Sequence, residues 1–151
     1  MSGLQKLIEF AERRVDRAAS AWQRLSTQRD EAKQKLLMLK QHGDSYRDLM
    51  ESSLKQGMSV TSTMAYMGFI GQIEAVVVRQ EGELGTLEEA CARLWQELVD
   101  ARREKRMYEI LRERAATREA EAQSRRGQAA IDELVQRAVK IPRNDILGDQ
   151  T

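Results

Sequence analysis

Apolar residues recur at alternating spacings of four and three along residues 4–50, and this spacing constrains the fold more than any other feature of the chain. The spacing averages 3.5 residues, slightly less than the 3.6 of a free α-helix, so the stripe stays on one side only if the helix supercoils around a partner. The first third of the chain is therefore predicted to be one long helix that requires a partner helix. The predicted seam residues are Leu4, Ile8, Ala11, Val15, Ala18, Trp22, Leu25, Arg29, Ala32, Leu36, Leu39, Gly43, Tyr46 and Met50.

The same spacing returns in the second half of the chain, where a further stripe can supply that partner. The segment between the stripes, residues 51–65, is rich in serine and threonine and contains a glycine; these residues favour turns and helix N-termini over helix interiors. The chain is therefore predicted to turn back and pair with itself as an antiparallel hairpin. The second stripe comprises Tyr66, Ile70, Ile73, Val77, Gln80, Leu84, Leu87, Cys91, Leu94, Leu98, Ala101, Lys105 and Tyr108.

The register of the hairpin follows from the ends of the two stripes. If Met50 faces Tyr66, facing residues have position numbers that sum to about 116, which places Trp22 beside Leu94 and Trp95. The predicted fold class is all-α: an elongated antiparallel two-helix coiled-coil hairpin with an overhanging C-terminal helix. The hairpin is expected over residues 1–140, with a first helix at 3–53, a connection at 54–62 and a second helix at 63–140, and residues 141–151 are expected to form a flexible tail.

Charge and hydropathy disfavour several function classes. Lys and Arg total 25 and Asp and Glu total 24, whereas a dedicated nucleic-acid binder needs a distinctly basic surface. No apolar stretch approaches the ~20 residues of a membrane span, and the N-terminus lacks the pattern of a secretory signal, so we expect a cytoplasmic protein without direct membrane insertion. The single cysteine, Cys91, occupies a seam position, which fits a reducing compartment.

The residue inventory also argues against enzyme chemistry. His42 is the only histidine, which disfavours histidine-based metal clusters and Ser-His or Cys-His catalytic sites. No glycine-rich phosphate loop follows a strand, and the carboxylates alternate with Lys and Arg at helical spacing, as is typical of solvated ion pairs. The sequence therefore predicts no catalytic residue, no metal site and no cofactor.

More apolar residues lie beside the predicted turn than the seam can use. The run Val76-Val77-Val78 cannot face a single partner helix, because successive residues differ by about 100° around the helix axis. An exposed apolar face usually binds a partner, and the alternative is that the methionine-rich connection folds over it. The residues expected at this face are Leu39, His42, Tyr46, Phe69, Ile73, Val76 and Gln80.

The second helix is predicted to extend beyond the first. Its residues 102–126 are basic, with nine Lys or Arg against five Glu. Farther along, an apolar stripe reappears at Ile131, Leu134, Val135, Ala138 and Val139, with no matching stripe elsewhere in the chain. Such an unpartnered amphipathic helix favours a docking role, and the alternative is that this end frays or bends back onto the N-terminus.

Several local segments, taken with the length of the chain and the position of the turn, are typical of one family. They are Leu4-Gln5-Lys6-Leu7 with Glu9-Phe10-Ala11-Glu12 and Val15-Asp16, Met38-Leu39 and Tyr46-Arg47, Tyr66 with Phe69-Ile70 and Ile73-Glu74, the basic residues 102–106, and residues 131–138. Over nearly the whole chain this conjunction resembles the flagellar FliJ family, the small coiled-coil stalks of the bacterial flagellar export ATPase.

The resemblance implies a non-enzymatic component of bacterial flagellar type III protein export, and so a role in motility. Such a stalk docks in the hexameric export ATPase FliI, couples it to the cytoplasmic domain of the export gate FlhA, has been linked to export chaperones, and is peripheral at the inner-membrane base of the flagellum. The face beside the turn would then contact the gate. The implied ATPase contacts are Arg13, Arg14, Arg112, Arg118, Ile131, Leu134, Val135, Arg137 and Ala138.

Three other interpretations remain open at the level of sequence. The chain could be the stalk of a virulence type III secretion system, which shares this architecture. It could be an export chaperone that binds secreted substrates directly. It could also be a structural coiled-coil dimer with no export role, in which the two stripes pair between chains.

Overall fold

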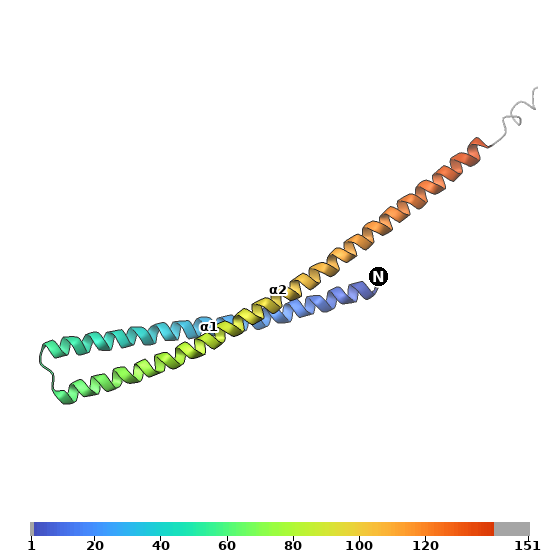
Figure 1. Cartoon of the computed structure of the whole chain (residues 1–151). Helices are drawn as coiled ribbons and strands as arrows, with labels where there is room; N and C mark the ends of the chain where they lie inside the picture. The colour runs from blue at the N-terminus through green and yellow to red at the C-terminus, as the bar shows by residue number, and fades with distance from the viewer. Residues whose placement is uncertain (1, 141–151) are drawn as a thin grey trace, which may run out of the picture. The chain divides into compact units, whose positions relative to one another are not determined.

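The computed structural model describes residues 2–140, and these residues form two α-helices, α1 (Ser2–Lys55) and α2 (Val60–Val139) (Figure 1). No strand occurs among them. The chain divides into two compact units, one formed by residues 1–8 and 106–151 and the other by residues 9–105. The predicted all-α hairpin of two long antiparallel helices is confirmed, and the expected tail at 141–151 lies outside the described residues.

The turn between the helices is built by one glycine and one serine. Gly57 has a φ of +87°, a conformation that favours glycine, and its backbone N–H donates to the Leu54 carbonyl at 3.2 Å, which closes the end of α1. Ser59 caps α2: its hydroxyl accepts from the Ser62 backbone N–H at 3.1 Å. The connection spans residues 56–59, shorter than the expected 54–62, because Thr61 and its neighbours fit into the capped first turn of α2.

Within the unit of residues 9–105, α1 and α2 run side by side in opposite directions (Figure 1). Trp22 packs against Trp95, with ring centroids 5.2 Å apart, and their position numbers sum to 117, next to the expected 116. The Cβ that a substitution would add at Gly43 meets the Ile73 side chain at 3.4 Å, a pair whose numbers sum to 116. The predicted register is therefore confirmed at both places.

The two predicted stripes form the buried seam. Every residue of both stripes is buried or half-buried, including Arg29, Gln80 and Lys105, whereas most residues outside the stripes are exposed. The tightest points are Ala11, Leu98 and Ala101, each no more than 2% exposed. Cys91, predicted in the seam, is buried with a free thiol. Because apolar burial is the main favourable term in folding, this seam holds the hairpin together.

In the unit of residues 1–8 and 106–151, the described N-terminal residues pack on the α2 segment that follows residue 105. Ile8 is 1% exposed, and the Arg112 guanidinium donates to the Gln5 side-chain oxygen at 3.3 Å. Beyond residue 110, every described residue of α2 except Ala122 is exposed. The residues up to Val139 belong to α2 itself, so no separate C-terminal helix occurs in the described part of the chain.

Truncation of a seam residue tests this account of stability. We expect Leu98→Ala to lower the free energy of unfolding by about 2–5 kcal/mol, because it leaves a cavity in the most buried part of the seam. The matched control is Leu37→Ala, which removes the same atoms from a side chain that is 50% exposed, and should change the value by less than about 1 kcal/mol. Urea unfolding followed by circular dichroism measures both; equal losses would contradict the seam.

Candidate functional site

The seam in residues 9–105 has two edges with different chemistry near the turn. Residues that directly follow Leu39 and Tyr46 in α1 lie along one edge, and residues that directly precede Gly43 and Met50 lie along the other. The same rule sorts the facing residues of α2. The two edges therefore offer separate surfaces to a partner, although the same seam supports both.

One edge carries a row of ion pairs, which we call the charged edge. Its three pairs recur every seven residues: Lys33–Glu88 at 3.9 Å, Lys40–Glu81 at 3.1 Å and Arg47–Glu74 at 2.6 Å. The hydrogen bond to the Glu74 carboxylate raises the pKa of the Arg47 guanidinium. All six side chains are about half exposed, so the pairs add little net stability. Their main effect is to fix the register and to keep this edge hydrated.

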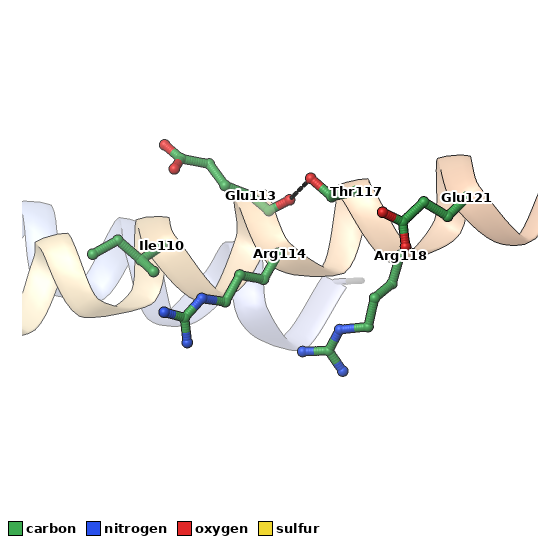
Figure 2. Close-up of a pocket in the computed structure, with 6 residues that line it drawn as sticks. All are labelled: Ile110, Glu113, Arg114, Thr117, Arg118 and Glu121. Atoms are coloured by element: carbon green, nitrogen blue, oxygen red, sulfur yellow. Dashed lines mark hydrogen bonds between the residues drawn. The ribbon is translucent and has the colours of Figure 1, made fainter.

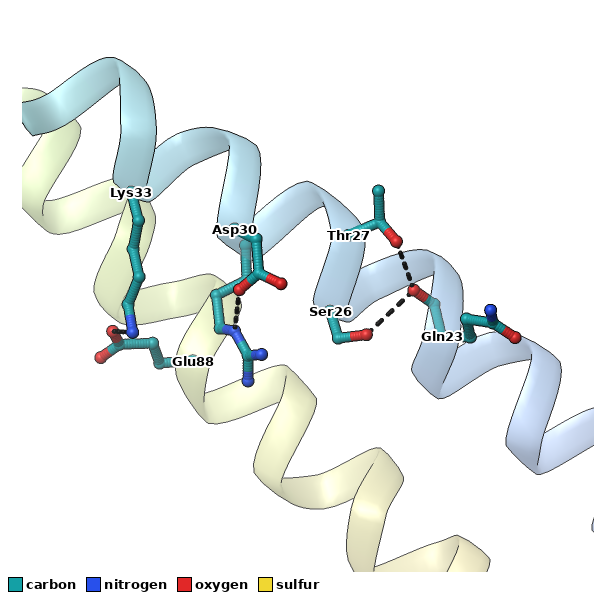
Figure 3. A network of polar contacts seen from close by, with 7 residues as sticks. Gln23, Ser26, Thr27, Asp30, Lys33 and Glu88 are labelled. Carbon is teal, nitrogen blue, oxygen red and sulfur yellow. Dashed lines mark hydrogen bonds and ion pairs between the residues drawn. The ribbon is translucent and has the colours of Figure 1, made fainter. Parts of the chain in front are cut away.

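The row of three ion pairs ends at Lys33–Glu88 (Figure 3). Seven residues before Lys33, the same position in the row is occupied by Ser26. Ser26 is buried and donates its hydroxyl to the Gln23 carbonyl at 2.9 Å. Thr27 donates to the same carbonyl at 2.9 Å. The seam residue Arg29 reaches Asp30 at 3.2 Å instead of crossing to α2. These polar groups are satisfied within α1, so the row of ion pairs at seven-residue spacing ends here, and the next inter-helix pair on this edge is Glu12–Lys105 at 4.0 Å.

The opposite edge near the turn is apolar, and it carries the seven residues predicted for the gate contact. The Tyr46 and Phe69 rings meet edge to face with centroids 4.6 Å apart, and Phe69 remains 44% exposed. His42 and Phe69 are exposed, whereas the other five residues are half-buried. We call this set the apolar edge: Leu39, His42, Tyr46, Phe69, Ile73, Val76 and Gln80.

The structure thus divides the apolar edge into two kinds of residue. Leu39, Tyr46, Ile73 and Gln80 are also seam residues, so each side chain contributes to packing as well as to the surface. His42 projects beyond the seam, and Phe69 remains 44% exposed although its ring contacts Tyr46, so both can meet a partner. Leu49, which is 50% exposed and directly precedes the seam residue Met50, lies on the same edge and escaped the sequence analysis.

The predicted ATPase contacts fall in both units. Arg13 and Arg14 belong to residues 9–105, where Arg14 is ion-paired with Glu104, on the same side of the seam as the apolar edge. Arg112 and Arg118 belong to the other unit. Figure 2 shows Arg114 and Arg118 extending from one side of α2, next to Thr117, whose hydroxyl donates to the Glu113 carbonyl at 2.9 Å. The shallow hollow drawn there is lined by α2 residues alone.

The C-terminal part of α2 carries the second predicted apolar surface. Ile131 and Val135 are each 55% exposed and Leu134 is 63% exposed, and their spacing places them on one face together with Ala138. Arg137 pairs with Glu133 at 3.0 Å within the helix. We call Ile131, Leu134, Val135 and Ala138 the C-terminal stripe. No residue in the described part of the chain covers this stripe.

In residues 2–140, no group of three or more His, Cys, Asp and Glu side chains could hold a metal ion. Over the same residues, neither helix has a stretch apolar enough to cross a bilayer. The hollows along the hairpin lie open on its edges, and the one between Leu39, Gly43 and Ile73 is bordered by the charged edge.

Comparisons with known proteins agree with this arrangement. The family model described as "Flagellar FliJ protein" matches residues 1–143. A curated relative with the same description, from Escherichia coli (strain K12), is 27% identical over 143 residues, which cover 89% of this chain and 92% of the relative. No solved structure matches the chain.

The division of the apolar edge makes a prediction about stability. We expect His42→Ala to change the free energy of unfolding by less than about 0.5 kcal/mol, because the side chain is exposed. Ile73→Ala should lower it by about 2 kcal/mol, because Ile73 packs in the seam against Gly43. Thermal and urea unfolding give both values; a large loss for His42→Ala would place His42 in the packing instead.

Proposed function

The chain belongs to the flagellar FliJ family, and we propose that it is the stalk that docks in the hexameric export ATPase FliI and couples it to the export gate FlhA. Membership of the family makes the chain a non-enzymatic component of flagellar protein export. What we propose beyond membership is which surface of the chain contacts which partner. In it the stalk is peripheral at the flagellar base, and export chaperones are further partners.

The observation that carries the gate assignment is the contrast between the two edges near the turn. A row of ion pairs covers one edge, whereas Phe69 and Leu49 stand exposed on the other. Burial of charged side chains against a partner is costly unless each is paired, whereas burial of exposed apolar area is favourable. The partner at this end should therefore approach the apolar edge, which we assign to the cytoplasmic domain of FlhA.

The C-terminal stripe supports the ATPase assignment. It occupies about two turns of helix, a length that suits an amphipathic helix lying in an apolar groove of a larger protein. An earlier segment of α2 is basic, with Arg112, Arg114 and Arg118 within two turns, so acidic groups on the partner would add attraction there. In this proposal the C-terminal part of α2 overhangs the hairpin and enters the FliI ring with the N-terminus.

One helix carries both surfaces. Phe69 of the apolar edge and Ile131 of the C-terminal stripe lie in the same unbroken α2. Coupling between two partners is a free energy shared by two binding sites, and a continuous helix is a direct physical connection between them. The seam that stiffens α2 between residues 66 and 108 would then serve this coupling.

The gate assignment is tested on the two residues that project beyond the seam. We expect the double variant His42→Ala, Phe69→Ala to weaken binding to the FlhA cytoplasmic domain at least about 10-fold, because the exposed apolar contact is lost. Stimulation of FliI should be unchanged. Leu37→Ala, an equally exposed leucine off this edge, is the matched control. Calorimetric titration measures binding, and unaltered affinity of the double variant would remove the assignment.

The ATPase assignment is tested at the C-terminal stripe. We expect Leu134→Ser with Val135→Ser to reduce FliI binding and stimulation strongly, because two anchors of the docking face become polar. Ala129→Ser with Ala130→Ser, between one and two turns earlier, lowers helix propensity at least as much and should leave both intact. Pull-down and ATP hydrolysis assays of the FliI hexamer, with helix content checked by circular dichroism, measure the effect. Normal stimulation by the stripe variant would contradict the proposal.

A further inference from the structure

A third apolar surface lies on the outer side of α2 near the turn, apart from the seam and from the apolar edge. Val60, Met64, Met67 and Val78 are 76%, 68%, 60% and 68% exposed. With the small residues spaced between and beyond them at intervals of three or four, they follow one line along the helix. We call this line the outer strip: Val60, Met64, Met67, Gly71, Ala75, Val78, Gly82 and Gly85.

The outer strip is separated from the other two surfaces around the helix. At about 100° per residue its members fall within an arc of about 80°, centred about 120° from the seam. Phe69 and Val76 of the apolar edge lie on nearly the opposite side of α2 by the same count. A partner helix on the outer strip would therefore avoid the residues proposed to meet the gate, although it would approach the charged edge, because Val78 lines a hollow together with Lys40 and Arg47 of α1.

No residue of the strip is charged, and no charged residue flanks its N-terminal part. Residues 56–73 contain no charged side chain in a chain that is 32% charged, and the next carboxylate, Glu74, is paired with Arg47. A helix packed on residues 60–71 of the strip would therefore bury no charged side chain of α2, and burial of an unpaired charge is the most costly event in forming an interface. Farther along, it would pass Arg79 and the ion-paired Glu74 and Glu81. The lack of charge on the strip itself argues that it accepts an uncharged apolar surface rather than an acidic or basic one.

The strip is also graded in size from one end to the other. Its N-terminal end carries the larger residues Val60, Met64 and Met67, whereas its C-terminal end carries Gly82 and Gly85. A Cβ built at Gly71, Gly82 or Gly85 would meet nothing in the chain within 4 Å, so these positions are open hollows on the helix surface. One end therefore offers protrusions and the other end offers spaces.

This gradient makes the strip complementary to itself when two copies run antiparallel. If position numbers across the contact sum to about 146, Met64 of one copy faces Gly82 of the other and Val60 faces Gly85. Met67 then faces Val78, and Gly71 faces Ala75 across the two-fold axis. Parallel pairing would instead put methionine on methionine and leave glycine facing glycine. From this match we propose that the outer strip is a homodimer interface, in which the α2 helices of two copies pack antiparallel.

The extent of the strip sets the strength expected of this dimer. Residues 60–85 cover about 38 Å of helix at 1.5 Å per residue. A single helix pair of that length lies at the low end of specific protein interfaces, so the dimer should be weak and depend on concentration. The proposed dimer uses none of the residues assigned to the gate or the ATPase. The tests of the dimer can therefore succeed or fail independently of those assignments.

The first test is the mass of the full chain in solution. We expect analytical ultracentrifugation to show a shift from monomer to dimer between about 10 μM and about 1 mM. Met64→Glu should hold the chain monomeric over this range, because it would bury a charge at the contact. Met38→Glu, the same change at a methionine that is 56% exposed elsewhere, should dimerise as the unaltered chain does. A monomer at every concentration, or a dimer unaffected by Met64→Glu, would overturn the proposal.

The second test fixes the register of the two copies. A Met64→Cys chain mixed with a Gly82→Cys chain under mild oxidation should give the mixed disulfide in several-fold excess over either homodimer, because only that pair is in contact. The unaltered chain is the control, since its own Cys91 is buried. Predominant Met64→Cys homodimers would show a parallel contact and overturn the antiparallel interface. Absence of any crosslink, with a monomeric mass, would do the same.

Discussion

The pairing of two 3.5-residue stripes within one chain is the interaction on which the rest of the structure depends. A helix as long as α1, with charged residues over most of its surface, cannot bury apolar area alone, so it is stable only where a second helix covers its stripe. α2 supplies that cover, and the turn at Gly57 and Ser59 places it in register. The surfaces discussed above consist of residues that this pairing leaves at least partly exposed.

The seam is not uniform along its length. Far from the turn it is tight, with Ala11, Leu98 and Ala101 almost fully buried and the two tryptophans packed together. Toward the turn it includes Gly43 and Gln80, and the flanking α2 carries several glycines, each of which lowers helix stability relative to alanine by roughly 0.5–1 kcal/mol. The evenly spaced ion pairs of the charged edge lie in this half, where they favour the observed register although each adds little stability.

The sequence sufficed to predict the features that follow from periodicity. The register near Trp22 and Trp95 and the burial of polar seam residues such as Arg29 follow from spacing alone, because a heptad position determines burial whatever residue occupies it. The charged edge followed the same spacing but was not recognised, since exposed Lys and Glu on a helix usually pair within the helix. The helix ends were placed less well, because the capping geometry at Gly57 and Ser59, rather than composition, determines where each helix stops.

The candidate contacts were harder to predict than the fold for a physical reason. In a two-helix hairpin no residue is far from solvent, so a side chain such as Ile73 or Tyr46 serves the seam and the surface together, and spacing cannot separate the two roles. The structure separates them through exposure: Phe69 and Leu49 project beyond the seam, whereas Ile73 packs against Gly43. A two-helix hairpin has few other residues that could form a binding surface. Its partners must therefore be recognised by residues at the margins of the seam and by the parts of α2 that the seam leaves uncovered.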